Sequence, residues 1–338
     1  MAEDTVTTRV RALLPGSGPR LAPLGPRAVI AILAVLAVLA IIGFMTIGAQ
    51  GSWSFILPFR GAKVWSMVLV GYAIALSTVM FQTATANRIL TPSIMGFDTL
   101  YALIQTTFVF FLGGLSYATF DPQLRFVLET GAMVGFALLL FRWLFSGAVR
   151  SLHLLVLAGI VLGVFFRSLS GLMQRLIDPN EFAVLQDALF ASFNTVDGTL
   201  LAVSSAAVLV ASVVALRLFP SLDVLSLGRE QAINLGVDHK RLVTTVLGIV
   251  AVLVSVSTAL VGPVTFLGLL VSNLAYMVIR SHRHAYVVPA AALIAIICLV
   301  GGQVILERVF GFNSALSIII DFLGGIMFLF LLLRSSKR

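Results

Sequence analysis

The chain has 338 residues, of which 59% are hydrophobic and only 11% are charged. A soluble domain carries about 25% charged residues, and a water-soluble fold of this length could not bury so much apolar side-chain surface. The composition excludes an ordinary soluble protein and predicts an all-α polytopic membrane protein.

Ten apolar runs are predicted to cross the bilayer, because each crossing needs about 20 mostly apolar residues. They cover residues 28–48, 64–85, 93–113, 124–145, 152–173, 197–218, 242–262, 267–280, 286–306 and 314–333. The eighth run is short and its start is poorly defined. The amphipathic residues 181–195 are expected at the outer interface or in a half-buried helix.

The basic residues orient these spans. With the N-terminus in the cytoplasm, sixteen of the 22 Lys and Arg residues fall on the inner side, as the positive-inside rule requires. Both termini are then cytoplasmic. The chain divides into a cytoplasmic tail over 1–27, a ten-helix transmembrane domain over 28–334 and a short tail over 335–338. The formal net charge of +8 thus reflects topology, and we expect no nucleic-acid partner.

Acids at membrane depth are functional candidates, because burying a charge is costly. Asp98, Glu129 and Asp321 are such acids. A role on the translocation path is one interpretation of each, with Asp98 and Asp321 the named candidates; interfacial hydration or a local hydrogen bond is the other. Gly159 and Gly163 form a Gly-x-x-x-Gly pair that allows close helix approach, either within the subunit or along the path.

The loop over residues 219–241 concentrates charge between two apolar spans. Pro220 is expected to end the preceding helix. Gly228 and Gly236 then bracket a short predicted helix over 229–235, with Glu230 in its first turn, where the helix dipole favours an acid. On a helical wheel Glu230, Gln231 and Asn234 share one side, and Ala232, Ile233 and Leu235 the other. The segment is either a solvated connector or a docking element for a cytoplasmic partner.

Other side chains give no sign of catalysis or of a bound cofactor. His282 and His284 have no neighbouring Cys or carboxylate in the sequence, whereas a zinc site needs about three or four ligands. Cys298 is the only cysteine, which excludes an internal disulfide and a multi-Cys metal site. None of the three lysines follows a glycine, so no phosphate-cradling Gly-Lys-Ser/Thr loop is present.

Five ordered stretches resemble the iron-chelate and vitamin B12 permease family of ABC importers. They read VGYAIALSTVMFQTATANRILTPSIMGFDTLYA (70–102), LLVLAGIVLGVFFRSLSG (154–171), LGREQAINLGVDHKR (227–241), ALVGPVTFLGLLVSNLAYMVIRSHRH (259–284) and LGGIMFLFLLLR (323–334). The similarity runs from about Arg60 to Arg334. The run ILTPSIMGFD is most similar to the siderophore branch.

The resemblance implies a permease subunit, not an enzyme, in the bacterial inner membrane. It would move a ferric siderophore into the cytoplasm by alternating access, paired with a second permease, two ATP-binding subunits and an extracytoplasmic substrate-binding protein. ATP and Mg would bind only to the partner ATPase. The short loop helix would be the coupling element, through the residues Arg229, Glu230, Gln231, Ala232, Asn234, Leu235 and Gly236.

The resemblance also implies outer bases that meet acids of the binding protein. The family's Arg-x-Pro-Arg before the second span reads Arg60-Gly61-Ala62-Lys63 here, and Arg308 is a further outer base. A solvated rim is the alternative for these three residues. The family's Pro-Glu-Leu-Pro-x-Gly before the last span is absent, and its Pro-His after Gly-Leu reads Ser272-Asn273, which leaves the gate and the ligand open.

Two rival functions remain at this point. An ion-coupled secondary transporter of a small organic solute would use ionisable groups at the midplane, such as Asp98 and Asp321, and would need no ATPase. An intramembrane enzyme would need a nucleophile-base or metal constellation, and the sequence shows none.

Overall fold

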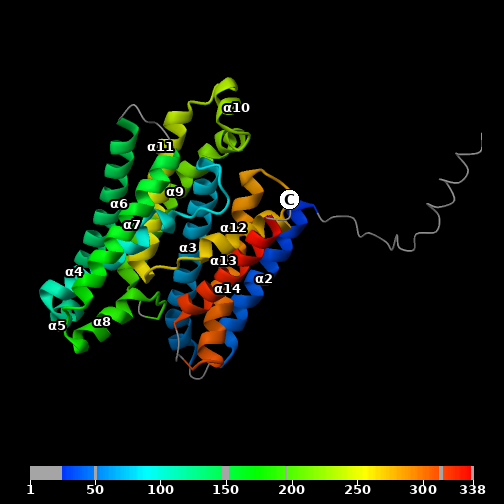
Figure 1. Cartoon of the computed structure of the whole chain (residues 1–338). Coiled ribbons are helices and arrows are strands. Elements are labelled where there is room, and N and C mark those ends of the chain that lie inside the picture. The colour runs from blue at the N-terminus through cyan, green and yellow to red at the C-terminus, as the bar shows by residue number, and fades with distance from the viewer. Residues whose placement is uncertain (1–24, 49–51, 147–151, 195, 312–314, 336–338) are drawn as a thin grey trace, which may run out of the picture.

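The computed structural model describes residues 25–48, 52–146, 152–194, 196–311 and 315–335. Every regular element in these ranges is helical (Figure 1). The elements are α2 (Pro26–Thr46), α3 (Trp53–Ala84), η1 (Pro92–Met95), α4 (Phe97–Leu112), α5 (Gly114–Thr119), α6 (Pro122–Ser146), α7 (Leu152–Gln174), α8 (Pro179–Leu189), α9 (Gly198–Leu225), α10 (Arg229–Asn234), α11 (His239–Val261), α12 (Leu267–Val278), α13 (His284–Arg308) and α14 (Leu316–Ser335). Most of the predicted tails, 1–27 and 335–338, lies outside the described residues.

Seven of these helices are long and apolar enough to cross a membrane: α2, α3, α6, α7, α9, α11 and α13. The shorter helices α4, α12 and α14 are also apolar, with α14 counted over Leu316–Met327. All ten coincide in sequence with the predicted spans. The all-helical membrane architecture is therefore confirmed.

Helices α3 and α11 form the centre of the bundle. Each has 72% of its most apolar stretch buried inside the protein, against 17% for α2 and 22% for α7. Helix α13 packs against both α2 and α3, and α11 packs against α3, α6 and α9. Leucine and valine side chains on α2, α7 and α9 point outward, as expected where lipid, not water, is the solvent.

Three helix boundaries differ from the prediction. Helix α3 begins at Trp53 and contains Pro58, so Arg60 and Lys63 lie within this helix, not before it. The predicted third span is split by Gly96, whose φ is 90°, into η1 and α4.

The expected end of α9 at Pro220 is also wrong. The helix continues to Leu225, because Leu222 and Leu225 are buried in the core and hold the turn after the proline in place. Prolines are tolerated inside membrane helices where neighbouring groups satisfy the freed backbone.

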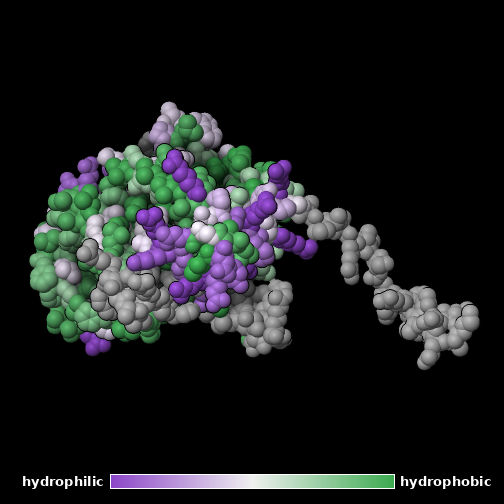
Figure 2. All heavy atoms as spheres, turned by 90° about the horizontal axis from the view of Figure 1, so that it is seen from above, coloured by the Kyte–Doolittle hydropathy of each residue, from purple (hydrophilic) through white to green (hydrophobic). Residues whose placement is uncertain are grey.

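The two ends of the bundle differ in character. Helix α10 lies at one end, with the end of α3 and the start of α13, whereas α5 and α8 lie at the opposite end (Figure 1). Seen from the α10 end, hydrophilic side chains gather over part of the surface, beside a broad area of apolar side chains (Figure 2). Arg88, Arg280 and Arg283 are among the exposed bases of the segments around α10.

Candidate functional site

The short helix α10 begins at a glycine that no other residue could replace without strain. Gly228 has φ 109° and ψ 160°, a backbone region that is essentially restricted to glycine. A Cβ at this position would also lie 2.8 Å from the Oε1 atom of Gln231. The sharp turn from α9 into α10 therefore depends on Gly228.

A second glycine ends α10. Gly236 has φ 85°, and its N–H donates to the carbonyl of Ile233 at 3.0 Å. The N–H of Val237 donates to the carbonyl of Ala232, also at 3.0 Å. These two bonds make a Schellman motif, so the predicted helix stop at Gly236 is confirmed, and Leu235 is the C-cap residue.

Helix α10 turns one small residue inward and several larger ones outward. Ala232 is fully buried against the core that α9 and α11 share. Ile233 and Leu235 share a side of the helical wheel with Ala232, but they are 49% and 63% exposed. The polar residues of this segment are exposed as well: Arg229, Glu230, Gln231 and Asn234. The helix thus presents a mixed apolar and charged surface at one end of the bundle.

Two of the predicted outer bases bind the end of α2. Arg60 donates to the carbonyls of Phe44 (2.6 Å), Met45, Ile47 and Gly48. Arg308 donates to the carbonyls of Ile47 at 2.7 Å and Gly48 at 3.1 Å. Cations suit a helix C-terminus, where carbonyls are left without partners. Arg60 is half-buried and Arg308 is exposed.

The third predicted outer base, Lys63, is buried and paired. Its Nζ donates to Asn194 Oδ1 at 2.9 Å and lies 3.8 Å from Glu307 Oε1. Gln303 Nε2 donates hydrogen bonds to Asn194 Oδ1 and to Glu307 Oε1. This network joins α3 to α13 and to the loop before α9. Lys63 is 8% exposed, so it offers little surface to a docking partner.

The acids Asp98 and Asp321 both bind the break between α11 and α12. The hydroxyl of Thr265 donates to Asp98 Oδ2 at 2.8 Å, and the backbone N–H of Phe266 donates to Asp321 Oδ1 at 3.2 Å. Residues 262–266 are therefore hydrogen-bonded to one acid from α4 and to one acid from α14. A helix break at membrane depth needs such partners for its freed backbone groups.

Gly159 and Gly163 of α7 pack directly against the start of α4. A Cβ on Gly159 would lie 3.0 Å from the Cα of Met95, and a Cβ on Gly163 would lie 3.3 Å from the Cα of Gly96. The Gly-x-x-x-Gly pair thus serves close packing within the subunit.

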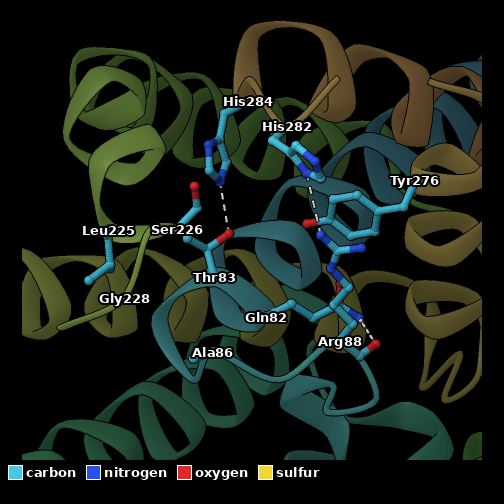
Figure 3. Close-up of a pocket in the computed structure, with 10 residues that line it drawn as sticks. All are labelled: Gln82, Thr83, Ala86, Arg88, Leu225, Ser226, Gly228, Tyr276, His282 and His284. Atoms are coloured by element: carbon cyan, nitrogen blue, oxygen red, sulfur yellow. Dashed lines mark hydrogen bonds between the residues drawn. The ribbon is translucent and has the colours of Figure 1, made fainter. Parts of the chain in front are cut away.

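A cavity of about 160 Å³ lies beside α10. Leu225, Ser226 and Gly228 line it from the turn between α9 and α10, and Figure 3 shows Arg88, Tyr276 and His282 across from them. The guanidinium of Arg88 stacks on the Tyr276 ring at 4.5 Å. In the described residues, no group of three or more His, Cys, Asp or Glu side chains could hold a metal ion.

A buried polar network joins α4 to α6 near the opposite end. The phenol of Tyr117 donates to Gln105 Oε1 at 2.8 Å, and Gln105 Nε2 donates to Glu129 Oε1 at 2.7 Å. Arg125 lies 3.5 Å from Glu129, one helical turn away. Glu129, an acid of unassigned role in the sequence, is therefore held by specific partners.

A model of the FecCD transport family matches residues 27–334, which include α10, the 262–266 break and both Gly159 and Gly163. The chain belongs to the FecCD transport family. The petrobactin import system permease protein YclO of Bacillus subtilis (strain 168) is 48% identical to it over 296 residues, which cover 88% of this chain and 94% of that protein.

Two further comparisons agree with this assignment. The petrobactin import system permease protein FatC of Bacillus anthracis is 37% identical, over 81% of this chain and 78% of that protein. A metal-chelate type ABC transporter solved in an inward-facing conformation covers 91% of this chain and 99% of its own, with a TM-score of 0.79 at 24% identity. At that identity the likeness concerns the fold. This FecCD chain is a multi-pass membrane protein.

Sequence reasoning missed several polar contacts of this FecCD chain. The Lys63–Asn194–Glu307 network and the Asp223–His284 contact join residues that are far apart in the sequence. No local sequence pattern predicts such contacts. Buried polar groups must find partners, which was the available signal for Lys63, Glu129 and His284. That signal says a partner exists without saying which one.

Proposed function

We propose that this chain is the permease subunit of an ATP-binding-cassette importer that moves a ferric siderophore into the cytoplasm. Sequence similarity to two petrobactin import permeases over most of the chain supports the substrate class. In this proposal all ten apolar helices span the bacterial inner membrane and both termini are cytoplasmic. Petrobactin, named in both relatives, is the first siderophore to test.

The single observation that carries the mechanism is the surface of α10. Ile233 and Leu235 are exposed beyond the membrane helices, beside the acid Glu230, on a helix fixed at both ends by glycines. Exposed apolar side chains rimmed by polar ones mark interaction surfaces. We assign α10 as the element on which an ATP-binding subunit docks. When the ATP-binding subunits close, α10 transmits that movement to the membrane helices.

The other proposed partners follow from the role of this chain as a permease that has no ATP site of its own. ATP and Mg bind to two ATPase subunits, and a second permease, either the same chain or a homologue, completes the pore. A substrate-binding protein delivers the chelate on the outer side. The candidate path passes the 262–266 break, which Asp98 and Asp321 contact through Thr265 and Phe266. Gly159 and Gly163 support this path from behind, by holding α7 close to the start of α4.

The outer bases are proposed to contribute unequally to docking of the binding protein. Arg308→Ala is expected to slow its association by a few-fold at low salt, and less at high salt, because rim charges act mainly on the association rate. Lys63→Ala should instead lower thermal stability, since it leaves Glu307 without its cation. Surface plasmon resonance and thermal unfolding separate the two. Equal association defects in both variants would contradict this assignment.

Uptake of radiolabelled ferric petrobactin by cells tests the function. Cells that express this permease with its ATPase and binding protein should accumulate the label, and an ATPase variant unable to hydrolyse ATP should abolish uptake. Competition with other unlabelled ferric siderophores defines the substrate range. Uptake that persists with the inactive ATPase would overturn the proposed function.

A further inference from the structure

A buried histidine joins three helices beside α10. His284 is the first residue of α13 and is 3% exposed. Its ring Nδ1 contacts Asp223 Oδ1 on α9, and its Nε2 lies 2.8 Å from the hydroxyl oxygen of Thr83 on α3. Figure 3 shows the ring directed at Thr83 at the edge of the 160 Å³ cavity. One side chain therefore contacts the last turn of α9 and the last turns of α3.

Asp223 holds α13 by its backbone as well. The N–H of His284 donates to the same Asp223 Oδ1 atom at 2.8 Å. The residue before α13, Arg283, provides no side-chain cap, so an acid from another helix fills that role. An acid at a helix N-terminus interacts favourably with the helix dipole. The start of α13 is thus tied to α9 through two hydrogen bonds to one carboxylate oxygen.

The turn that connects Asp223 to α10 is continuously hydrogen-bonded. The hydroxyl of Ser226 donates to the carbonyl of Asp223 at 2.6 Å. The N–H of Gly228 donates to the carbonyl of Leu225, and the N–H of Ala232 donates to the carbonyl of Gly228, both at 3.0 Å. With Ala232 buried against the core, α10 and the end of α9 have little freedom to move separately. A push on α10 therefore displaces Asp223.

Beside the packing of α9 against α3 and α13, polar contacts at the edge of the cavity make a second connection. Leu225, Ser226 and Gly228 face Arg88 and His282 across space that protein atoms do not fill. At the edge of that space, Asp223, His284 and Thr83 bridge the α9–α10 turn to α13 and α3. Close-packed groups transmit displacement, and an unfilled gap does not. The bridge is therefore a direct route from α10 to these two helices.

We propose that His284 is a positioning residue for coupling: held between Asp223 and Thr83, it transmits the displacement of α10 to α13 and to the central helix α3. This inference rests on the proposed function, in which an ATP-binding subunit pushes on α10. If the Asp223–His284–Thr83 contacts only stabilised the fold, their loss would lower the amount of complex that assembles. If they transmit movement, their loss lowers the amount of substrate transported per hydrolysed ATP.

The test measures transported ferric petrobactin per hydrolysed ATP in proteoliposomes that hold the complete importer. The variants are Asp223→Ala, His284→Ala and the double variant, with His282→Ala as the matched control, because His282 lines the same cavity outside the bridge. Each bridge variant is expected to lower the ratio by about fivefold or more, the lower end of coupling between distinct sites, while ATP hydrolysis continues. The double variant should match the worse single variant, because both remove one connection.

Three results would overturn this role for His284. They are a normal ratio in both single variants, an equal loss in His282→Ala, or losses that multiply in the double variant. His284→Gln provides a milder arm: it can keep a contact to Thr83 and should retain part of the ratio. An α10 variant, Ile233→Ser with Leu235→Ser, is run in parallel. If ATPase binding is unchanged in that variant, the docking role of α10 has failed, whatever the His284 variants show.

Discussion

Replacing Ile233 and Leu235 together by serine is expected to weaken binding of the ATP-binding subunit by about a hundredfold. The two side chains are 49% and 63% exposed on α10. Burying a full side chain of this size is worth about 1.5–3 kcal/mol, so burying the exposed half of each contributes roughly 1.4 kcal/mol, or a factor of about ten. Titration of purified permease with labelled ATPase measures the change directly.

The fold should survive this double change, because neither side chain contributes to the core. Thermal unfolding of the isolated permease should therefore be the same as for the wild type. Leu115→Ser is the matched control, because Leu115 is 84% exposed on α5 at the opposite end of the bundle. Unchanged ATPase affinity in the α10 variant, or an equal loss in Leu115→Ser, would remove α10 as the docking element.

The second large effect is expected at the contact between α7 and η1. Gly159→Leu should destabilise the permease by about 3 kcal/mol, the upper part of the usual range for overpacking, because its Cβ would lie 3.0–3.1 Å from backbone atoms of Met95. Backbone cannot rotate away as a side-chain end can. The unfolding temperature in detergent should fall by roughly 4 °C, given an unfolding entropy of about 2.1 cal/mol/K per residue, and transport should be lost as the start of α4 is displaced.

Gly171→Leu controls for the gain in helix propensity. Gly171 lies on the same helix, and a Cβ there meets no heavy atom within 4 Å. Since leucine is the better helix former, this variant should be as stable as the wild type or slightly more stable. Gly159→Leu with normal stability and transport would show that α7 can move away from η1, against the packing described above.

The sequence was sufficient to place the apolar helices and the ends of α10. Apolar length identifies transmembrane helices because the bilayer sets their length, and Gly228 and Gly236 mark backbone angles that other residues rarely adopt. Gly159 and Gly163 likewise indicated a close approach of helices. Each of these signals is local, so a single stretch of residues carries it.

Other features could not be read locally. Pro220 normally ends a helix, yet packing of Leu222 and Leu225 continues α9 past it. Arg60 and Lys63 looked like free outer bases, but their partners Phe44, Asn194 and Glu307 come from distant segments. On α10 the wheel grouped Ile233 with Ala232, whereas only the smaller residue fits against α9 and α11. These outcomes depend on tertiary contacts that periodicity does not encode.

The most direct test of the central claim is accumulation of ferric petrobactin in proteoliposomes, with and without the ATPase subunits. The permease and the binding protein alone should produce no accumulation above the external concentration, with or without an imposed proton gradient. Adding the ATPase and ATP on the α10 side should produce it. Accumulation by the permease without any ATPase would show that this chain drives uphill transport without ATP hydrolysis by a partner. That result would contradict the proposed function.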